Sequence, residues 1–160
     1  IFLDGDLFNS GVRPAINVGI SVSRVGGNAQ IKAMKKVSGT LKLDQAQFRE
    51  LEAFAKFGSD LDAVTLNVIE KGRRNVEILK QAQNDPFKVE DQVAIIYAGS
   101  KNLLREVPVN KVKEFETEYI EFLRAKHSDV LATLKAGKLT DEVTDTLTAV
   151  AKELSSKYSA

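Results

Sequence analysis

The 160-residue sequence contains no cysteine, no tryptophan and a single histidine, His127. The lack of cysteine excludes disulfide bonds, thiol nucleophiles and zinc sites with thiolate ligands, and it fits a reducing compartment. A Ser-His-Asp triad would have to use His127, whose spacing instead predicts a partly exposed helix residue. We therefore expect no metal centre and no nucleophilic catalytic site of these kinds.

An excess of either charge is also missing, since 23 basic side chains face 22 acidic ones and the net charge is +1. This balance disfavours a protein whose main task is to bind a polyanion, so we expect no nucleic-acid partner. The longest unbroken apolar run, residues 93–98, is far shorter than the roughly 18 residues that a membrane span requires. We therefore expect no direct membrane insertion.

The remaining composition is that of an ordinary globular protein, with 43% hydrophobic and 28% charged residues. At this length roughly two thirds of the unfolded surface can be buried, so one compact domain needs no covalent staple. The chain starts inside an apolar triplet, residues 1–3, which is typical of the end of a strand. We expect the chain to be a fragment or a processed product of a longer protein.

The texture of the sequence changes near residue 28. Residues 1–27 contain five of the ten glycines together with Pro14. Apolar residues and serines alternate over residues 20–23, which predicts a short strand that leads into a loop. Residues 1–27 are therefore predicted to form strand and loop structure.

From residue 28 onward, apolar residues recur at spacings of three and four, which predicts a mainly α-helical bundle of about five to six helices. The predicted helices and their apolar faces are 28–37 (Ile31, Met34, Val37), 44–57 (Phe48, Leu51, Phe54, Ala55), 62–81 (Leu66, Ile69, Val76, Leu79), 89–101 (Val89, Val93, Ile96), 108–137 (Val112, Phe115, Tyr119, Phe122, Val130, Leu131, Leu134) and 140–154 (Val143, Leu147, Val150, Leu154). Asn28 and Thr140 are expected N-caps, and Gly137 is an expected helix end. The second and third helices should form an αα-hairpin.

Familiar motifs for phosphate and calcium binding are absent from the sequence. The only Gly-Lys pair, residues 137–138, is not followed by Ser or Thr, and Asp60-x-Asp62 is not followed by the third ligand and the glycine of a calcium loop. Two basic clusters, residues 32–36 and 71–74, lie among acidic residues without stacking aromatics. We expect both clusters to be solvated helix faces.

One segment differs in kind from these patterns. Residues 19–27 bring Arg24 into a loop, with Ser21 and Ser23 before it and two glycines after it. The fork of donors on an arginine suits phosphate oxygens, especially when the charge arrives from outside the subunit that holds the phosphate. The alternative is a salt bridge or a loop-capping role for Arg24, and spacing alone favours that alternative.

Three blocks of the sequence resemble the C-terminal portion of F-type ATP synthase alpha subunits. They are GVRPAINVGISVSRVG at residues 11–26, QFREL through AFA to FGSDLD at residues 47–62, and EILKQ at residues 77–81. The resemblance covers the whole chain, and its first block is the most specific. Beta chains of the same enzyme share the Ser-Arg ending of that block, but they differ before it and carry a longer acidic segment in place of residues 58–62.

The resemblance implies a helical C-terminal domain, residues 28–160, after residues 1–27 as the incomplete tail of an α/β nucleotide-binding domain. It implies a noncatalytic alpha subunit that supports ATP synthesis from ADP and phosphate coupled to proton transport. Arg24 would be an arginine finger that reaches the beta-subunit catalytic site, and Ser21 and Ser23 would support its loop. The residues implied to face the rotating central stalk are Phe57, Gly58, Ser59, Asp60, Leu61 and Asp62.

The implied partners are the beta and gamma subunits and other head and stalk subunits. ATP or ADP with Mg²⁺ would bind the full-length complex, whereas these 160 residues alone are expected to bind no cofactor and to be inactive. The implied location is peripheral on the energy-coupling membrane, on the cytoplasmic face in bacteria or the matrix face in mitochondria. The alternative is a stand-alone helical protein-interaction module whose resemblance to the synthase is incidental.

Overall fold

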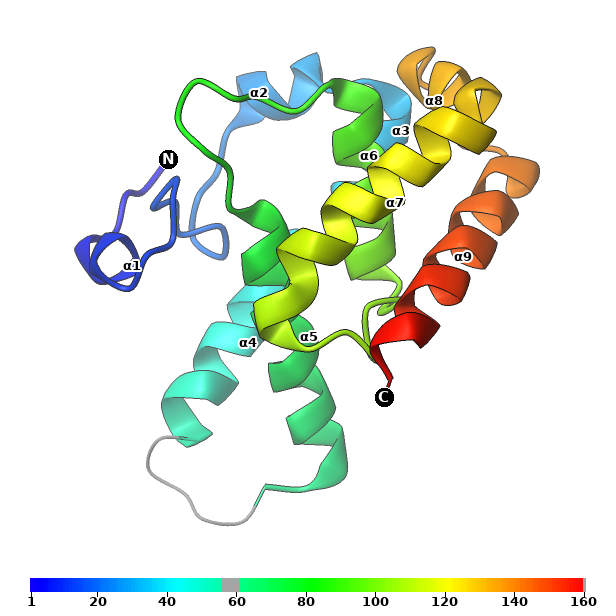
Figure 1. The fold of residues 1–160 in the computed structure, drawn as a ribbon. Helices are drawn as coiled ribbons and strands as arrows, with labels where there is room; N and C mark the ends of the chain where they lie inside the picture. The colour runs from blue at the N-terminus through cyan, green and yellow to red at the C-terminus, as the bar shows by residue number, and fades with distance from the viewer. Residues whose placement is uncertain (56–60, 160) are drawn as a thin grey trace.

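The computed structural model describes residues 1–55 and 61–159, and in these ranges the regular structure is helical, without a β-strand (Figure 1). The elements in chain order are α1 (Gly5–Asn9), α2 (Arg24–Ala29), α3 (Lys32–Ser38), α4 (Leu41–Ala55), α5 (Ala63–Leu79), α6 (Val89–Ser100), the 3-10 turn η1 (Val109–Lys111), α7 (Val112–Lys126), α8 (Ser128–Lys135), α9 (Asp141–Ser155) and the 3-10 turn η2 (Ser156–Tyr158). The predicted mainly α fold is confirmed.

Helix α6 lies at the centre of the bundle, where it contacts α3, α5, α7, α8 and α9. Its sequence is apolar on several faces, and a helix of that kind is stable only when neighbours surround it. Val93 and Ala94 have no exposed surface. The hydroxyl groups of the two buried tyrosines have hydrogen-bond partners. The Tyr119 hydroxyl donates to the Leu147 carbonyl at 3.1 Å, and the Tyr97 hydroxyl lies 3.1 Å from the Thr148 hydroxyl.

Helices α4 and α5 form the predicted αα-hairpin, which projects from one end of the bundle (Figure 1). The two helices approach closely because Gly72 of α5 faces the ring of Phe48, where a Cβ atom would overlap the ring. The buried side chain of Gln45 donates to the Gly72 carbonyl at 3.4 Å. An ion pair of 2.7 Å joins Lys71 to Asp44 across the same contact.

The outer part of the hairpin corrects two predictions of burial. Phe54 is 66% exposed and Leu66 is 47% exposed, although the helical period placed both on apolar faces. Phe54 is next to the last residue of α4 and Leu66 is the fourth residue of α5, and these helix ends extend beyond the bundle. The basic cluster at residues 71–74 is also not simply solvated, since Lys71 pairs with Asp44 and Arg74 donates to the Val107 carbonyl at 2.8 Å.

The predicted long helix over residues 108–137 is wrong in its continuity. The chain begins this region with η1 and then divides into α7 and α8 at His127, whose backbone has φ −136° and ψ 45°. His127 is therefore a half-buried residue between two helices rather than a helix residue. The break lets α7 contact α9 while α8 turns onto α6. The predicted end at Gly137 is confirmed, with φ +79° and a bond from the Lys138 amide to the Thr133 carbonyl of 3.1 Å.

The N-terminal segment lies beside the bundle and is mostly irregular (Figure 1). An antiparallel bridge joins Leu3 to Ile16 within it. The predicted strand over residues 20–23 is wrong, because a strand needs a paired neighbour and no described segment supplies one there. Asn28 is not the expected N-cap, since it lies inside α2, which begins after Ser23. Among the described helices, none has the length and apolar character needed to cross a bilayer.

Candidate functional site

Arg24 is the first residue of α2, and Ser23 caps that helix. The Ser23 hydroxyl accepts a hydrogen bond of 3.0 Å from the Gly26 amide, and the Ser23 carbonyl accepts one of 2.9 Å from the Gly27 amide. A serine in this position satisfies amides that the first turn would otherwise leave unpaired. The backbone of Arg24 is therefore fixed by its own flanking residues.

Ser21 secures the loop before Arg24. Its hydroxyl donates to the Asn17 carbonyl at 2.6 Å and accepts from the Phe2 amide at 3.1 Å. The Ser21 amide also donates to the Asn17 carbonyl, at 3.1 Å. Both serines thus bond to backbone groups, one on each side of Val22, and hold the turn that carries Arg24.

The Arg24 side chain is exposed, and it forms no hydrogen bond or ion pair with any described residue. Most other arginines of the protein differ in this respect: Arg49 and Arg73, for example, pair with glutamates at 3.0 and 2.9 Å. The salt-bridge alternative for Arg24 therefore has no partner within residues 1–55 and 61–159. A fixed backbone with an unengaged guanidinium suits binding to a group outside the chain.

The predicted stalk-facing segment is described only at its end, since Phe57, Gly58, Ser59 and Asp60 lie outside the described residues. Leu61 is half-buried. Asp62 is the N-cap of α5, and its carboxylate accepts bonds of 2.9 Å from the Val64 and Thr65 amides and of 2.7 Å from the Thr65 hydroxyl. The hydrogen bond from the Thr65 amide, followed by that from the Thr65 hydroxyl, contributes most to holding the pKa of Asp62 below its usual value.

Exposed apolar side chains flank this segment. Phe54, 66% exposed, lies near the end of α4, and Val64, 73% exposed, lies at the start of α5. Contiguous exposed apolar patches are typical of contact surfaces, and each of these two helix ends exposes a large apolar side chain. The described ends of α4 and α5 therefore combine exposed apolar side chains with the fixed carboxylate of Asp62.

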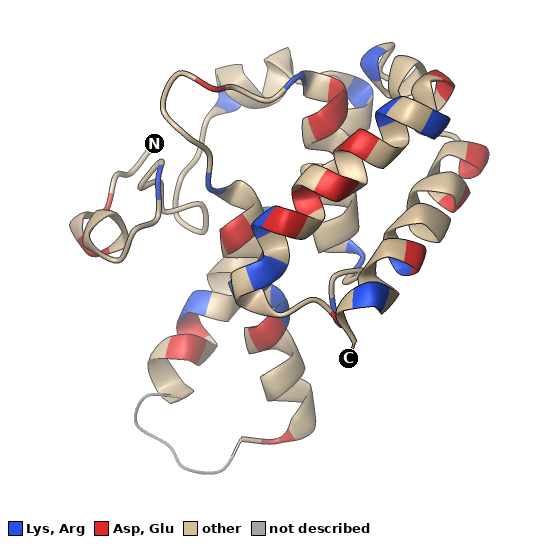
Figure 2. Cartoon of the chain, viewed as in Figure 1, with Lys and Arg blue, Asp and Glu red and all other residues tan. Residues whose placement is uncertain are grey.

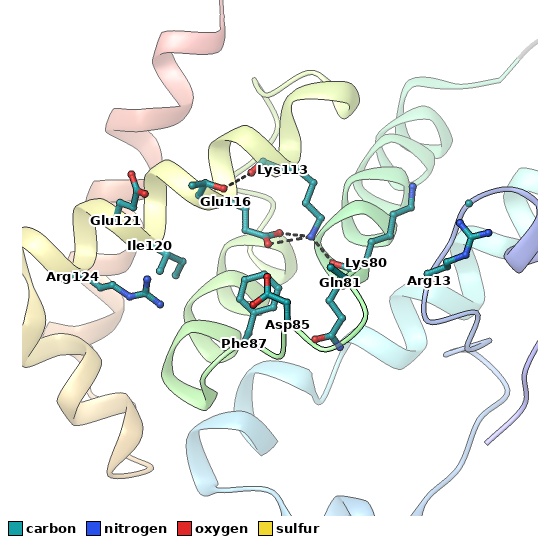
Figure 3. Close-up of a pocket in the computed structure, with 13 residues that line it drawn as sticks. Arg13, Lys80, Gln81, Asp85, Phe87, Lys113, Glu116, Ile120, Glu121 and Arg124 are labelled. Carbon is teal, nitrogen blue, oxygen red and sulfur yellow. Dashed lines mark hydrogen bonds and ion pairs between the residues drawn. The ribbon is translucent and has the colours of Figure 1, made fainter.

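A hollow of about 520 Å³ lies between α7 and the loop that follows α5 (Figure 3). Lys113 donates there to the Lys80 carbonyl at 2.5 Å and to both oxygens of the buried Glu116 at 3.1 and 3.0 Å. Burial raises the pKa of Glu116, and Lys113 opposes that effect. Arg124 pairs with the buried Asp91 at 2.5 Å. None of these residues was predicted from the sequence. Lys113 and Arg124 of α7 both pair with buried carboxylates of the same protein.

A second hollow, of about 580 Å³, lies where the N-terminal segment meets the loop that follows α5. The Arg13 guanidinium lies 4.3 Å from the centre of the Phe8 ring, and the Gln81 amide donates to the Arg13 carbonyl at 3.0 Å. These contacts attach the N-terminal segment to the bundle. No group of three or more histidine, aspartate or glutamate side chains in the described parts of the protein is placed to hold a metal ion.

Comparison with known proteins adds two findings to this geometry. The profile of the family described as "ATP synthase alpha/beta chain, C terminal domain" matches residues 30–154. The sequence is also similar to proteins named ATP synthase subunit alpha from Flavobacterium johnsoniae (80% identical over 99% of the chain), Christiangramia forsetii (79% over 99%) and Parabacteroides distasonis (60% over 96%). The chain spans 30% of the length of each of these curated relatives. The resemblance seen in the sequence is therefore not incidental.

Proposed function

This chain belongs to the family formed by the C-terminal domains of ATP synthase alpha and beta subunits, and from that membership we propose that it acts as part of a noncatalytic alpha subunit in the head of an F-type ATP synthase. Two relatives at 80% and 79% identity carry the alpha name, which supports the alpha assignment. In this proposal residues 28–160 form the helical domain, and residues 1–27 complete a nucleotide-binding domain. The chain would support ATP synthesis coupled to proton transport.

In the proposed function, Arg24 reaches a nucleotide held by a neighbouring beta subunit. The observation that carries this role is the exposed guanidinium of Arg24, which is unpaired among the described residues and stands on a backbone that Ser21 and Ser23 hold. The sequence has no phosphate loop of its own, so a phosphate that meets Arg24 must be held elsewhere. A positive charge at that position would stabilise the charge on the transferring phosphoryl group.

The test is multisite ATP hydrolysis by a reconstituted alpha-beta-gamma head that carries Arg24→Ala in full-length alpha. Arginine fingers contribute on the order of 10³ to 10⁵ in rate, so turnover should fall by about that range. Nucleotide affinity should fall far less, because the interaction strengthens in the transition state. Arg24→Lys should restore little activity, since lysine keeps the charge but loses the planar fork.

Arg105→Ala is the matched control, because Arg105 is also an exposed arginine and lies on the loop after α6. This variant should assemble and turn over like the parent enzyme. Assembly of each complex is confirmed by gel filtration before its activity is measured. If Arg24→Ala assembles normally and turns over within a few-fold of the parent, Arg24 is structural and the proposed role is wrong.

The outer end of the α4–α5 hairpin is proposed to contact the rotating central stalk. The exposed side chains of Phe54 and Val64 and the fixed carboxylate of Asp62 support this role. Residues 57–60 belong to the same proposed contact. The partners in this proposal are the beta and gamma subunits together with other head and stalk subunits.

The proposed location follows from the same membership. The complex would sit peripherally on an energy-coupling membrane, on its cytoplasmic face, since the relatives compared are bacterial proteins. ATP or ADP with Mg²⁺ would be held by other parts of the complex. The present chain would supply Arg24 and the stalk contact but no phosphate loop.

A further inference from the structure

We propose that Gly19 and Ala46 form a close contact that positions Arg24, so that Gly19 and Ala46 are positioning residues for the catalytic site of the neighbouring subunit. This inference rests on the proposed role of Arg24. It adds a specific joint between α4 and the loop that carries the arginine.

The contact is tight enough that a side chain at residue 19 would require its neighbour to shift by a few tenths of an ångström. A Cβ atom on Gly19 would lie 3.0 Å from the Ala46 Cα and 3.3 Å from both the Ala46 Cβ and the Ala46 nitrogen. Gly19 does not have a positive φ, so its backbone conformation is open to other residues. The close approach of the loop backbone to α4 therefore favours glycine at this position.

Two hydrogen-bonded turns lie along the chain from Gly19 to Arg24, and only Val22 separates them. The turn that contains Gly19 is closed by the two bonds from Ser21 to the Asn17 carbonyl, of 3.1 Å and 2.6 Å. Ser23 then caps α2, which begins at Arg24. A shift of the turn at Gly19 would therefore move Arg24 with it.

On the other side of the contact, Ala46 belongs to α4, next to residues that bind α5. Its neighbour Gln45 is buried and donates to the Gly72 carbonyl of α5 at 3.4 Å. Asp44, one residue earlier, pairs with Lys71 at 2.7 Å. Because α4 and α5 are joined through the two residues before Ala46, a displacement of the hairpin would reach Gly19 through Ala46.

The main test places Gly19→Ala in full-length alpha within the assembled alpha-beta-gamma head. The added methyl group should push the loop away from α4 and lower turnover at saturating ATP by about 10-fold, since sub-ångström misplacement of a charged group is costly in rate. The KM for ATP should change by less than about 3-fold, because the nucleotide is held elsewhere. Ala46→Gly removes only the Cβ atom of Ala46, while the Cα and nitrogen that also meet the new methyl group belong to the backbone, so the double variant Gly19→Ala with Ala46→Gly should recover only part of the lost turnover.

A double-mutant cycle of Gly19→Ala with Arg24→Ala tests whether Gly19 acts through Arg24. Adding Gly19→Ala to Arg24→Ala should lower turnover no further, since the group being positioned is already gone. A purely structural defect would instead add its loss to that of Arg24→Ala. Gly5→Ala is the matched control, because a Cβ atom on Gly5 of the same segment meets nothing within 4 Å. Thermal melting and gel filtration establish that every variant is folded and assembled.

The outcomes separate this inference from the function on which it rests. If Arg24→Ala lowers turnover but Gly19→Ala does not, the joint is wrong and the role of Arg24 stands. If Gly19→Ala lowers turnover but its loss adds to that of Arg24→Ala, the positioning role is wrong. If Arg24→Ala leaves turnover unchanged, the proposed function itself fails.

Discussion

Two glycines set the distance of α5 from its neighbours. A Cβ atom on Gly72 would overlap the Phe48 ring of α4, and a Cβ atom on Gly99 of α6 would lie 2.6 Å from the Asn75 side-chain oxygen. Phe48 is 2% exposed and Asn75 is fully buried, so neither residue can move into solvent without opening the core. These contacts make both glycines sensitive to the addition of a single methyl group.

Gly72→Ala should therefore destabilise the protein by about 1–3 kcal/mol, which is the usual effect of overpacking a well-packed site. Urea unfolding followed by circular dichroism measures the change in midpoint. Asn67→Ala, at an exposed position of the same helix, is the control and should change the midpoint little. Combining Gly72→Ala with Phe48→Leu should recover part of the loss. An unchanged midpoint for Gly72→Ala would contradict the close contact.

At this scale the sequence predicts some features and misses others. The placement of Arg24 with two serines before it was visible as a local pattern, and the structure gives both serines local hydrogen bonds. The contact of Gly19 with Ala46 could not be predicted, because it joins residues 27 positions apart and depends on the packing of the segment against α4. The same reason hides the pairing of Asp91 with Arg124.

The sequence predicted which segments are helical more reliably than it predicted where a helix is interrupted. The predictions for α6 and α9 agree with the structure, including the Thr140 cap of α9. The break at His127 was missed because the apolar period continues from α7 into α8. The pair Ser128 and Asp129 after the break is typical of a helix start and was the available signal. The exposure of Phe54 and Leu66 was missed because periodicity does not distinguish a core face from a face directed at a partner.

The cap of α5 gives a prediction at the scale of one element. Asp62→Ala removes three hydrogen bonds from the first turn and should lower the melting temperature, whereas Asp62→Ser should retain most of the stability because serine is also a good N-cap. Thermal unfolding by circular dichroism compares the two variants with the parent protein. Equal melting temperatures for Asp62→Ala and the parent would contradict the capping role.

The pH dependence of this effect has a definite sign. The pKa of Asp62 is lowered from 3.8 in the folded protein, so its stabilising contribution is present above that value and is lost as the pH falls through the lower folded pKa. The difference in melting temperature between the parent and Asp62→Ala should shrink in that acidic range.

Asp62→Ser keeps the cap without the charge, so it is also the variant that tests the carboxylate in the proposed stalk contact, by rotation and coupling measurements on the assembled enzyme.

The whole molecule has two surfaces of different character. Charged residues of both signs lie along α7 and α9, while the N-terminal segment carries few of them (Figure 2). Exposed apolar side chains gather instead on that segment, among them Leu3, Val22 and Val25, which is 82% exposed. Apolar exposure of this kind is typical of a surface that another protein segment covers. It supports the proposal that residues 1–27 meet further parts of the longer subunit or its beta neighbour.

The proposal that other parts of the complex bind the nucleotide leads to a last prediction. The 160 residues alone should neither hydrolyse ATP nor bind Mg-ATP tightly, because the sequence supplies an arginine but no phosphate loop and no metal-holding carboxylate in a recognisable setting. Arg24 by itself cannot retain a triphosphate, since a single exposed ion pair contributes under about 1 kcal/mol. Calorimetric titration of the 160 residues with Mg-ATP is the measurement, with circular dichroism to establish that the helices are folded. Saturable binding in the micromolar range would mean that this part of the protein holds nucleotide itself, and the assignment of nucleotide binding to other parts of the complex would then be wrong.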